Sequence, residues 1–197
     1  TARDLGIQTG LPEVPSLALG AASVPLLEMV GAYATLANEG KVVRPYALLS
    51  VEDSQGNQLG LFQVPHPGKR RVDPENCRII TNMLQAAVDE GTGHALRSKF
   101  QVPGQFAGKT GTTQENADGW FIGYTPGYTA GCRVGADDPA IHFRTMAYGQ
   151  GAYSALPVVG RFFSQTYADS RFKPLANLKF ATPDSFLVAE MNSMPSH

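Results

Sequence analysis

Three strand-like runs follow one another at short intervals within residues 105–136, and this spacing limits the possible folds more than any other feature of the chain. They read QFAGKTGTT, GWFIGYT and TAGCRVGA, and the connections between them are rich in Gly, Pro, Asn and Asp. A parallel crossover needs a dozen or more residues, so these short links favour antiparallel neighbours. The sequence therefore predicts an antiparallel sheet built from the three runs.

Three other stretches carry the apolar spacing of amphipathic helices. The first covers residues 25–38 and stops at Gly40. The second begins after Asp73, a favourable N-cap, and ends at Gly91. The third covers about residues 154–169. The side chains predicted to face inward are Leu26, Met29, Val30, Tyr33, Leu36 and Ala37 in the first helix, Ile80, Met83, Leu84, Ala87 and Val88 in the second, and Leu156, Val159, Phe162 and Phe163 in the third.

The remaining patterns complete an α+β fold, with a mainly antiparallel sheet packed with helices. Residues 44–64 read as two strands around a polar turn at residues 53–57, and the residues after Ser170 show no clear period. The predicted organisation is a mainly helical part with a hairpin in residues 1–104, three sheet strands and the final helix in residues 105–169, and an irregular tail in residues 170–197.

Composition excludes several classes of function. With 197 residues and 43% hydrophobic content, the chain can bury the core of one domain or of a large part of one. A net charge of -1 gives no bulk attraction to nucleic acid or to an anionic membrane, so no nucleic-acid partner is expected. The basic group at residues 69–71 is interpreted as a solvated loop. No apolar run approaches the ~18 residues that span a bilayer.

The cysteines and histidines do not predict a metal centre. The four histidines show no ligand spacing with each other or with Cys77 and Cys132. Each cysteine falls in a helix or strand pattern and is interpreted as a small buried hydrophobe. We therefore expect no metal and no cofactor.

The glycine-rich run GKTGTT, which begins at Gly108, contains a lysine and three threonines. A phosphate-binding P-loop needs five residues from its first glycine to its second, whereas Gly104 precedes Gly108 by four. A P-loop also opens a helix, and this run leads into the strand-like stretch at residues 120–124. Both spacing and context therefore exclude a P-loop.

A strand edge that grips an extended peptide ending in a carboxylate explains the same residues. Lys109 would supply a point charge, and the hydroxyls of Thr110 and Thr112 would donate hydrogen bonds to the carboxylate. Gly111 would leave the edge bare for a substrate backbone to pair as an added strand. The backbone N–H of Thr112 could point at a developing oxyanion.

Four segments carry a resemblance to a known family. They are LPEVPSLALGAASVPLLEMVGAYATLANEG, DEGTGHAL, AGKTGTTQENADGWFIGYTPG and CRVGADD, and they occur in one order over about residues 4–169. In these segments the chain resembles the penicillin-binding transpeptidases that cross-link bacterial peptidoglycan, and more narrowly the class A, 1a-like penicillin-binding proteins. The resemblance implies a β-lactamase/transpeptidase-like fold, with the active site in a cleft between the sheet and a helical subdomain.

The chemistry implied by this resemblance is serine acyl transfer. A serine in S-x-x-K attacks the penultimate D-Ala carbonyl of a stem peptide, D-Ala leaves, and an amine of a second stem peptide takes the acyl group. β-Lactams imitate the D-Ala-D-Ala end and trap the serine. The family's third motif matches Lys109 as the catalytic lysine, with Thr110, Gly111 and Thr112 as substrate-binding residues.

The other two motifs of the family are missing. The single S-x-x-K string, SRFK from Ser170 to Lys173, follows the K-T-G and is interpreted as a coincidence, and there is no S-x-N string. The resemblance thus implies the C-terminal half of an incomplete transpeptidase domain, inactive by itself. It further implies that the parent protein carries the nucleophile upstream, has a glycosyltransferase domain, and is anchored at the periplasmic face of the bacterial inner membrane.

Two alternatives and one structural consequence stay open. The chain could belong to a β-lactamase or a D,D-carboxypeptidase, or it could be a non-catalytic peptide-binding module. In the family, the strand that matches residues 128–136 pairs on its outer side with a strand that precedes the nucleophile. We therefore expect this edge to be unpaired here, and either to self-associate or to be covered by residues after Ser170.

Some neighbours of the motif invite a functional interpretation, but structural roles are favoured. Adjacent strand residues face opposite ways, so Trp120 and Phe121 are expected to pack. Asp118 and Glu115 are interpreted as turn formers. His142 lies near what the resemblance implies is the rim of the site, and a structural role is expected for it too.

Overall fold

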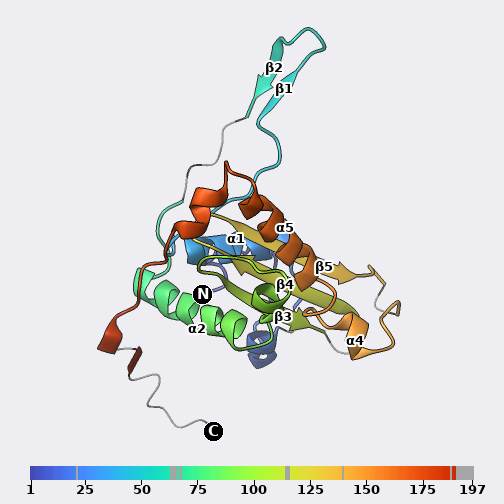
Figure 1. Ribbon diagram of the computed structural model, residues 1–197. Coiled ribbons are helices and arrows are strands. Elements are labelled where there is room, and N and C mark those ends of the chain that lie inside the picture. The colour runs from blue at the N-terminus through green and yellow to red at the C-terminus, as the bar shows by residue number, and fades with distance from the viewer. Residues whose placement is uncertain are drawn as a thin grey trace.

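A computed structural model describes residues 1–20, 22–62, 66, 68–113, 116–138, 140–186 and 188–189. Its centre is a three-stranded antiparallel sheet in the order β3-β4-β5 (Figure 1). The strands are β3 (Ala107–Thr112), β4 (Asp118–Tyr124) and β5 (Thr129–Gly135). The register places Lys109 opposite Ile122 and Phe121 opposite Cys132. The antiparallel sheet predicted from the short connections is confirmed.

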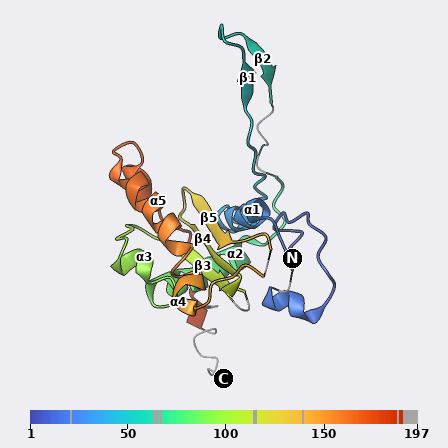
Figure 2. The same ribbon diagram turned by 90° about the vertical axis from the view of Figure 1, so that its right-hand side faces the viewer.

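Helices cover both faces of this sheet (Figures 1 and 2). On one face lie α1 (Leu26–Ala37) and α2 (Pro74–Asp89). There the rings of Tyr33 and Tyr124 meet edge to face, and the hydroxyls of Thr81 and Tyr124 are 2.9 Å apart. On the other face α5 (Leu156–Ala168) joins Phe121 in the main hydrophobic core. Because successive side chains of a strand alternate in direction, Phe121 and Tyr124 point to opposite faces of the sheet.

Short elements complete the described chain. They are the 3₁₀ helix η1 (Pro15–Leu19), the hairpin strands β1 (Ser50–Glu52) and β2 (Gln58–Leu61), the helices α3 (Ala95–Ser98) and α4 (Met146–Gly149), and the 3₁₀ helix η3 (Lys173–Asn177). The predicted hairpin is confirmed, and it projects away from the body of the molecule (Figures 1 and 2). No helix among the described residues is long and apolar enough to cross a membrane.

The predicted ends of α1 and α2 are confirmed by their backbone geometry. The Asp73 side chain accepts hydrogen bonds from the backbone N–H groups of Glu75 and Asn76, which caps α2. Gly40 ends the turn after α1 with φ +81°, and a Cβ there would collide with the carbonyl of Val72. Glycine is therefore required where the chain leaves α1.

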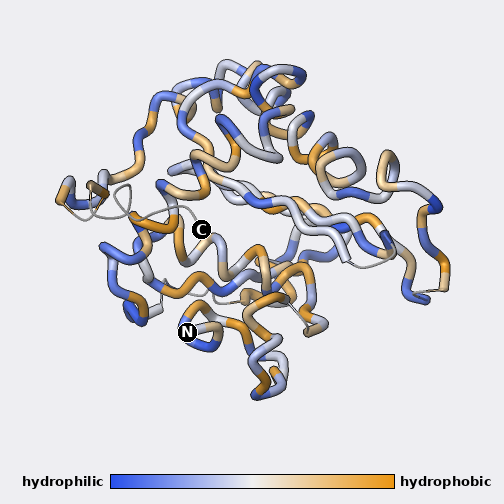
Figure 3. Tube along the Cα trace, turned by 90° about the horizontal axis from the view of Figure 1, so that it is seen from below, coloured by the Kyte–Doolittle hydropathy of each residue, from blue (hydrophilic) through white to orange (hydrophobic). Residues whose placement is uncertain are grey.

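The predicted inward faces were partly wrong. Ile80 and Met83 are 39% and 51% exposed, whereas Cys77, Thr81 and Val88 are the buried residues of α2. The buried stripe is rotated because Thr81 packs against the Tyr124 hydroxyl, a polar contact that a purely apolar pattern does not reveal. Figure 3 shows how apolar and polar residues are interspersed along the trace.

A similar correction applies to α5. Phe162 is 46% exposed, while Gly160 and Tyr167 are buried with Phe163. Gly160 allows the helix to approach Phe100 so closely that an added Cβ would lie 2.7 Å from its ring. This approach turns the Gly160 side of the helix inward and leaves Phe162 at the surface.

The outer edge of β5 has no strand partner among the described residues, as expected. The alternative that the tail covers this edge is wrong for the tail as far as it is described. Phe172 meets the ring of Tyr128 just before β5, and η3 packs on α5, but no tail segment pairs with the strand. The 3₁₀ helix η3 also interrupts the tail that we interpreted as irregular. Self-association through residues 128–136 stays a prediction.

Candidate active site

The four residues singled out in the K-T-G run lie together on β3, a strand at the edge of the sheet. The N–H of Thr113 donates to the carbonyl of Asp118 on β4 over 3.0 Å. Because backbone direction alternates along a strand, the N–H and C=O groups of Thr110 and Thr112 point away from β4, toward the edge that pairs with no strand in the described part of the chain. The backbone groups needed to pair with an extended peptide are therefore available.

The exposed part of β3 coincides with the motif. Ala107 and Gly108 are buried, Thr110 and Gly111 are partly buried, and Lys109 and Thr112 are exposed. Three hollows in the described part of the chain lie elsewhere and are not lined by the motif residues. The motif residues thus lie on an open part of the surface rather than inside a hollow.

The ammonium group of Lys109 sits at the free edge of the strand. Its Nζ donates to the backbone carbonyl of Thr110 over 2.7 Å. The Lys109 side chain leaves the strand on the opposite face from Thr110 and Thr112, so its long stem bends back to reach that carbonyl. A cation and an outward-facing carbonyl therefore meet where the edge is open.

The hydroxyl of Thr110 is held by a residue that the sequence interpretation passed over. Thr92 lies in the turn after α2, and its Oγ1 is 2.7 Å from the Oγ1 of Thr110. The flanking Gly93 donates its N–H to the Ala87 carbonyl, and a Cβ on Gly91 would lie 2.8 Å from that carbonyl, so the turn folds tightly onto the helix end. The sequence signal is the GTG string that begins at Gly91, the predicted end of the second helix.

The hydroxyl of Thr112 is also held from another segment. It accepts the N–H of Gly151 over 3.2 Å. A Cβ on Gly151 would lie 2.5 Å from the Gly111 carbonyl and 2.1 Å from the Trp120 carbonyl. Only glycine permits this approach, so the segment before α5 and the motif strand form one packed unit.

Several neighbours of the motif have structural roles. Asp118 begins β4 and forms a 2.6 Å ion pair with Arg133, although its buried Oδ1 receives no well-aligned hydrogen bond. Phe121 is fully buried in the core, as predicted, and Trp120 is partly buried. His142 is exposed. Glu115 lies outside the described residues.

The cysteines and the metal-ligating types of side chain add no second reactive centre in the described ranges. Cys77 and Cys132 are free thiols, and burial raises the pKa of both. No group of three or more histidine, cysteine, aspartate or glutamate side chains comes together there in a way that could hold a metal ion. The exposed edge of β3, where the motif residues lie together, is therefore the candidate active site.

Comparisons with known proteins agree with this fold. The chain matches the family "Penicillin binding protein transpeptidase domain" over residues 13–154, which is well over half of its length. The chain belongs to this family of penicillin-binding transpeptidase domains.

Curated relatives show which members of this family the chain is similar to. Penicillin-binding protein 1A of Rickettsia conorii is 31% identical over 95% of this chain and 25% of its own length. Penicillin-binding protein 2D of Bacillus subtilis is 35% identical over 70% of this chain and 20% of its own. The chain therefore spans about a quarter or less of the length of these curated relatives.

Solved structures share the fold. The crystal structure of penicillin-binding protein 1A from Haemophilus influenzae superposes with a TM-score of 0.76, at 22% identity, over 92% of this chain and 31% of that one. PonA1 from Mycobacterium tuberculosis superposes with a TM-score of 0.69, at 24% identity, over 93% of this chain and 51% of that one. The expected transpeptidase-like α+β fold is confirmed.

Proposed function

We propose that the chain is the C-terminal part of a class A D,D-transpeptidase domain and supplies the strand that grips the substrate carboxylate. The observation that carries the proposal is the free edge of β3, where the backbone groups of Thr110 and Thr112 face outward beside the Lys109 ammonium. A donor peptide that pairs with this edge would place its terminal carboxylate near one cation and two hydroxyls.

The reaction would be acyl transfer to a serine that lies upstream in the parent protein. The serine attacks the penultimate D-Ala carbonyl, the C–N bond breaks, and D-Ala leaves with the proton. An amine of a second stem peptide then attacks the acyl-serine ester, the ester C–O bond breaks, the amine's proton passes to the serine oxygen, and a new peptide bond forms. The outward N–H of Thr112 would stabilise the oxyanion in both steps.

Lys109 would act by charge rather than by forming a bond. Its present acceptor is the Thr110 carbonyl, a neutral partner at the free edge. An incoming carboxylate is a stronger acceptor for an ammonium group, so the side chain can exchange this contact for a charge-assisted one. β-Lactams carry the same carboxylate and would bind in the same manner.

Thr92 and Gly151 would be positioning residues for this grip. Each threonine hydroxyl has one proton to donate and two lone pairs to accept. Gly151 N–H occupies a lone pair of Thr112, which leaves its proton for the substrate. When the Thr92 hydroxyl donates its proton to the Thr110 hydroxyl, the proton of Thr110 is likewise left for the substrate.

The proposal extends to the whole protein, in which residues 1–197 form the C-terminal portion of one transpeptidase domain. Its partners would be peptidoglycan stem peptides and β-lactams, and it would work at the periplasmic face of the inner membrane beside a glycosyltransferase domain. The direct test is acylation of the parent protein by a fluorescent penicillin, with and without Lys109. An unchanged rate in a folded Lys109→Ala variant would refute the role of the motif.

A further inference from the structure

A hollow of about 860 Å³ lies beside the segment that follows α1, and its lining residues have no part in the proposed transpeptidase reaction. Its cationic side chains are Arg3, Arg44, Lys69 and Arg71. Three separate chain segments contribute them: the first turn of the chain, the stretch after α1, and the loop before α2. We propose that this hollow binds a polyvalent phosphate group.

The backbone pairing explains why these particular cations converge. Lys41 and Arg70 form an antiparallel bridge, so their side chains share one face of the two paired segments. Lys69 and Arg71, one residue to either side, project from the opposite face, into the hollow. The basic run interpreted as a solvated loop is therefore divided between two surfaces.

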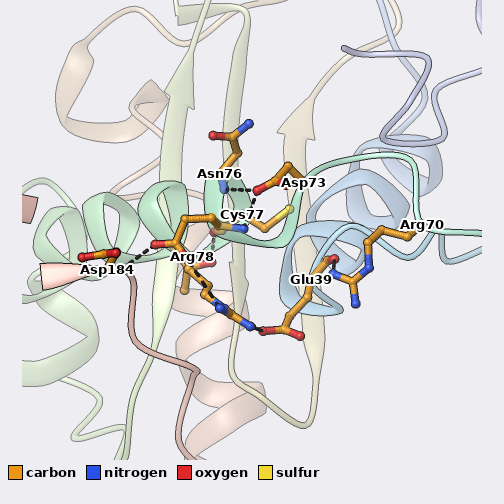
Figure 4. Close-up of polar contacts among 9 residues, drawn as sticks. Glu39, Arg70, Asp73, Asn76, Cys77, Arg78 and Asp184 are labelled. Carbon is orange, nitrogen blue, oxygen red and sulfur yellow. Dashed lines mark hydrogen bonds and ion pairs between the residues drawn. The ribbon is translucent and has the colours of Figure 1, made fainter. Parts of the chain in front are cut away.

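Arg70 has a separate structural role on the other face. Its guanidinium donates to the backbone carbonyl of Glu39, at the end of α1 (Figure 4). The carboxylate of Glu39 accepts from Arg78 over 2.6 Å. Arg70 thus ties the loop to the helix pair and does not line the hollow.

The floor of the hollow is apolar and closely packed. Ile7 and Val42 are buried, at 9% and 7% exposure. A Cβ on Gly6 would lie 3.3 Å from Val42, and one on Gly68 would lie 3.1 Å from it, while Gly68 N–H bonds the Val42 carbonyl over 2.8 Å. The segments that carry the cations are thereby held against one another.

No carboxylate lines the hollow, and none of its four cations forms an ion pair within the described ranges. Glu28 accepts the N–H groups of Gln8 and Thr9, and these bonds lower its pKa. The local excess of positive charge stands out in a chain whose net charge is -1.

Phosphate fits this arrangement better than a single carboxylate does. Arginine forks match phosphate oxygens in paired hydrogen bonds, and a group with three or four negative charges can satisfy several cations at once. A carboxylate would leave most of the positive charge unmatched. The volume lies within the roughly 300–1,000 Å³ of ordinary ligand sites, so the phosphate can carry an organic group over the apolar floor.

Adjacent arginines provide a matched pair of variants for the test. Binding of inorganic pyrophosphate to the full-length parent protein is measured by titration calorimetry in a low-salt buffer without phosphate. Arg71→Gln should weaken binding at least tenfold, since it removes one charge-assisted contact. Arg70→Gln removes the same charge from the other face and should change the affinity less than about threefold. Arg44→Gln should behave as Arg71→Gln does, which guards against one variant that fails to fold.

A second arm identifies the source of the phosphate. Vesicles that carry phosphatidic acid replace pyrophosphate, with the same three variants. If the pattern appears with the vesicles, the group is a lipid headgroup; if it appears only with pyrophosphate, the ligand is a soluble phosphate. Absence of binding in both arms would overturn the proposal, as would equal losses in Arg70→Gln and Arg71→Gln. Penicillin acylation should stay unchanged in all three variants, so this test is independent of the proposed transpeptidase role.

Discussion

The hydroxyl of Thr92 lies 2.7 Å from the hydroxyl of Thr110, and this contact joins the turn after α2 to the motif strand. Thr92→Val in the parent protein should slow acylation by a fluorescent penicillin about tenfold, the value of one hydrogen bond. Thr92→Ser keeps the hydroxyl and should stay within about threefold of the unmodified rate. An esterified penicillin, which has no carboxylate to grip, should not distinguish the variants. Equal rates for valine and serine would rule out a positioning role.

Removing the Lys109 charge at the strand edge should slow acylation more than removing the Thr92 hydroxyl. Lys109→Ala is expected to lower the second-order rate of penicillin acylation by about 10²-fold or more, because a charge aimed at the carboxylate and the transition state is lost. The matched control is Lys99→Ala, since the Lys99 ammonium stands 5.6 Å from the centre of the Phe100 ring. Stopped-flow labelling of both variants gives the comparison, and equal rates would place Lys109 outside the site.

The antiparallel sheet and the motif strand could be predicted from the sequence because both depend on local patterns. Short polar links imply antiparallel neighbours, and K-T-G with its surroundings is a contiguous signal. Thr92 and Gly151 could not be found in this way, because their contacts with Thr110 and Thr112 join segments 18 and 39 residues apart. The rotated face of α2 was missed for a related reason, since its buried stripe centres on a threonine.

Close packing at Gly151 leads to a stability prediction. In Gly151→Ala the new methyl group would collide with the carbonyls of Gly111 and Trp120. We expect the free energy of unfolding of the complete transpeptidase domain to fall by about 1–3 kcal/mol, with slower acylation because the Thr112 hydroxyl is displaced. Gly10→Ala is the control, because a Cβ there meets nothing within 4 Å. Thermal unfolding that is equal for the two variants would contradict the packing argument.

The buried phenol of Tyr124 makes the stability of the fold depend on pH in the alkaline range. Burial raises the pKa of Tyr124 above its ordinary value of 10.0, although its bond to Thr81 lowers it. The folded state therefore favours the neutral phenol, and this stabilisation is complete below pH 10 and is lost as the pH rises above it. Tyr124→Phe should cost about 1 kcal/mol at neutral pH and flatten the alkaline loss of stability. Urea unfolding across this range checks both, and an unchanged alkaline slope would contradict the assignment.

The site of penicillin attachment tests the central claim most directly. The parent protein and the isolated 197-residue chain are each treated with a fluorescent penicillin, denatured, digested and mapped by mass spectrometry. The account predicts a covalent adduct in the parent protein on a serine upstream of Thr1, and no stable adduct on the isolated chain, because acylation needs an activated serine hydroxyl. An adduct that survives denaturation and maps to a serine between Thr1 and His197 would contradict it.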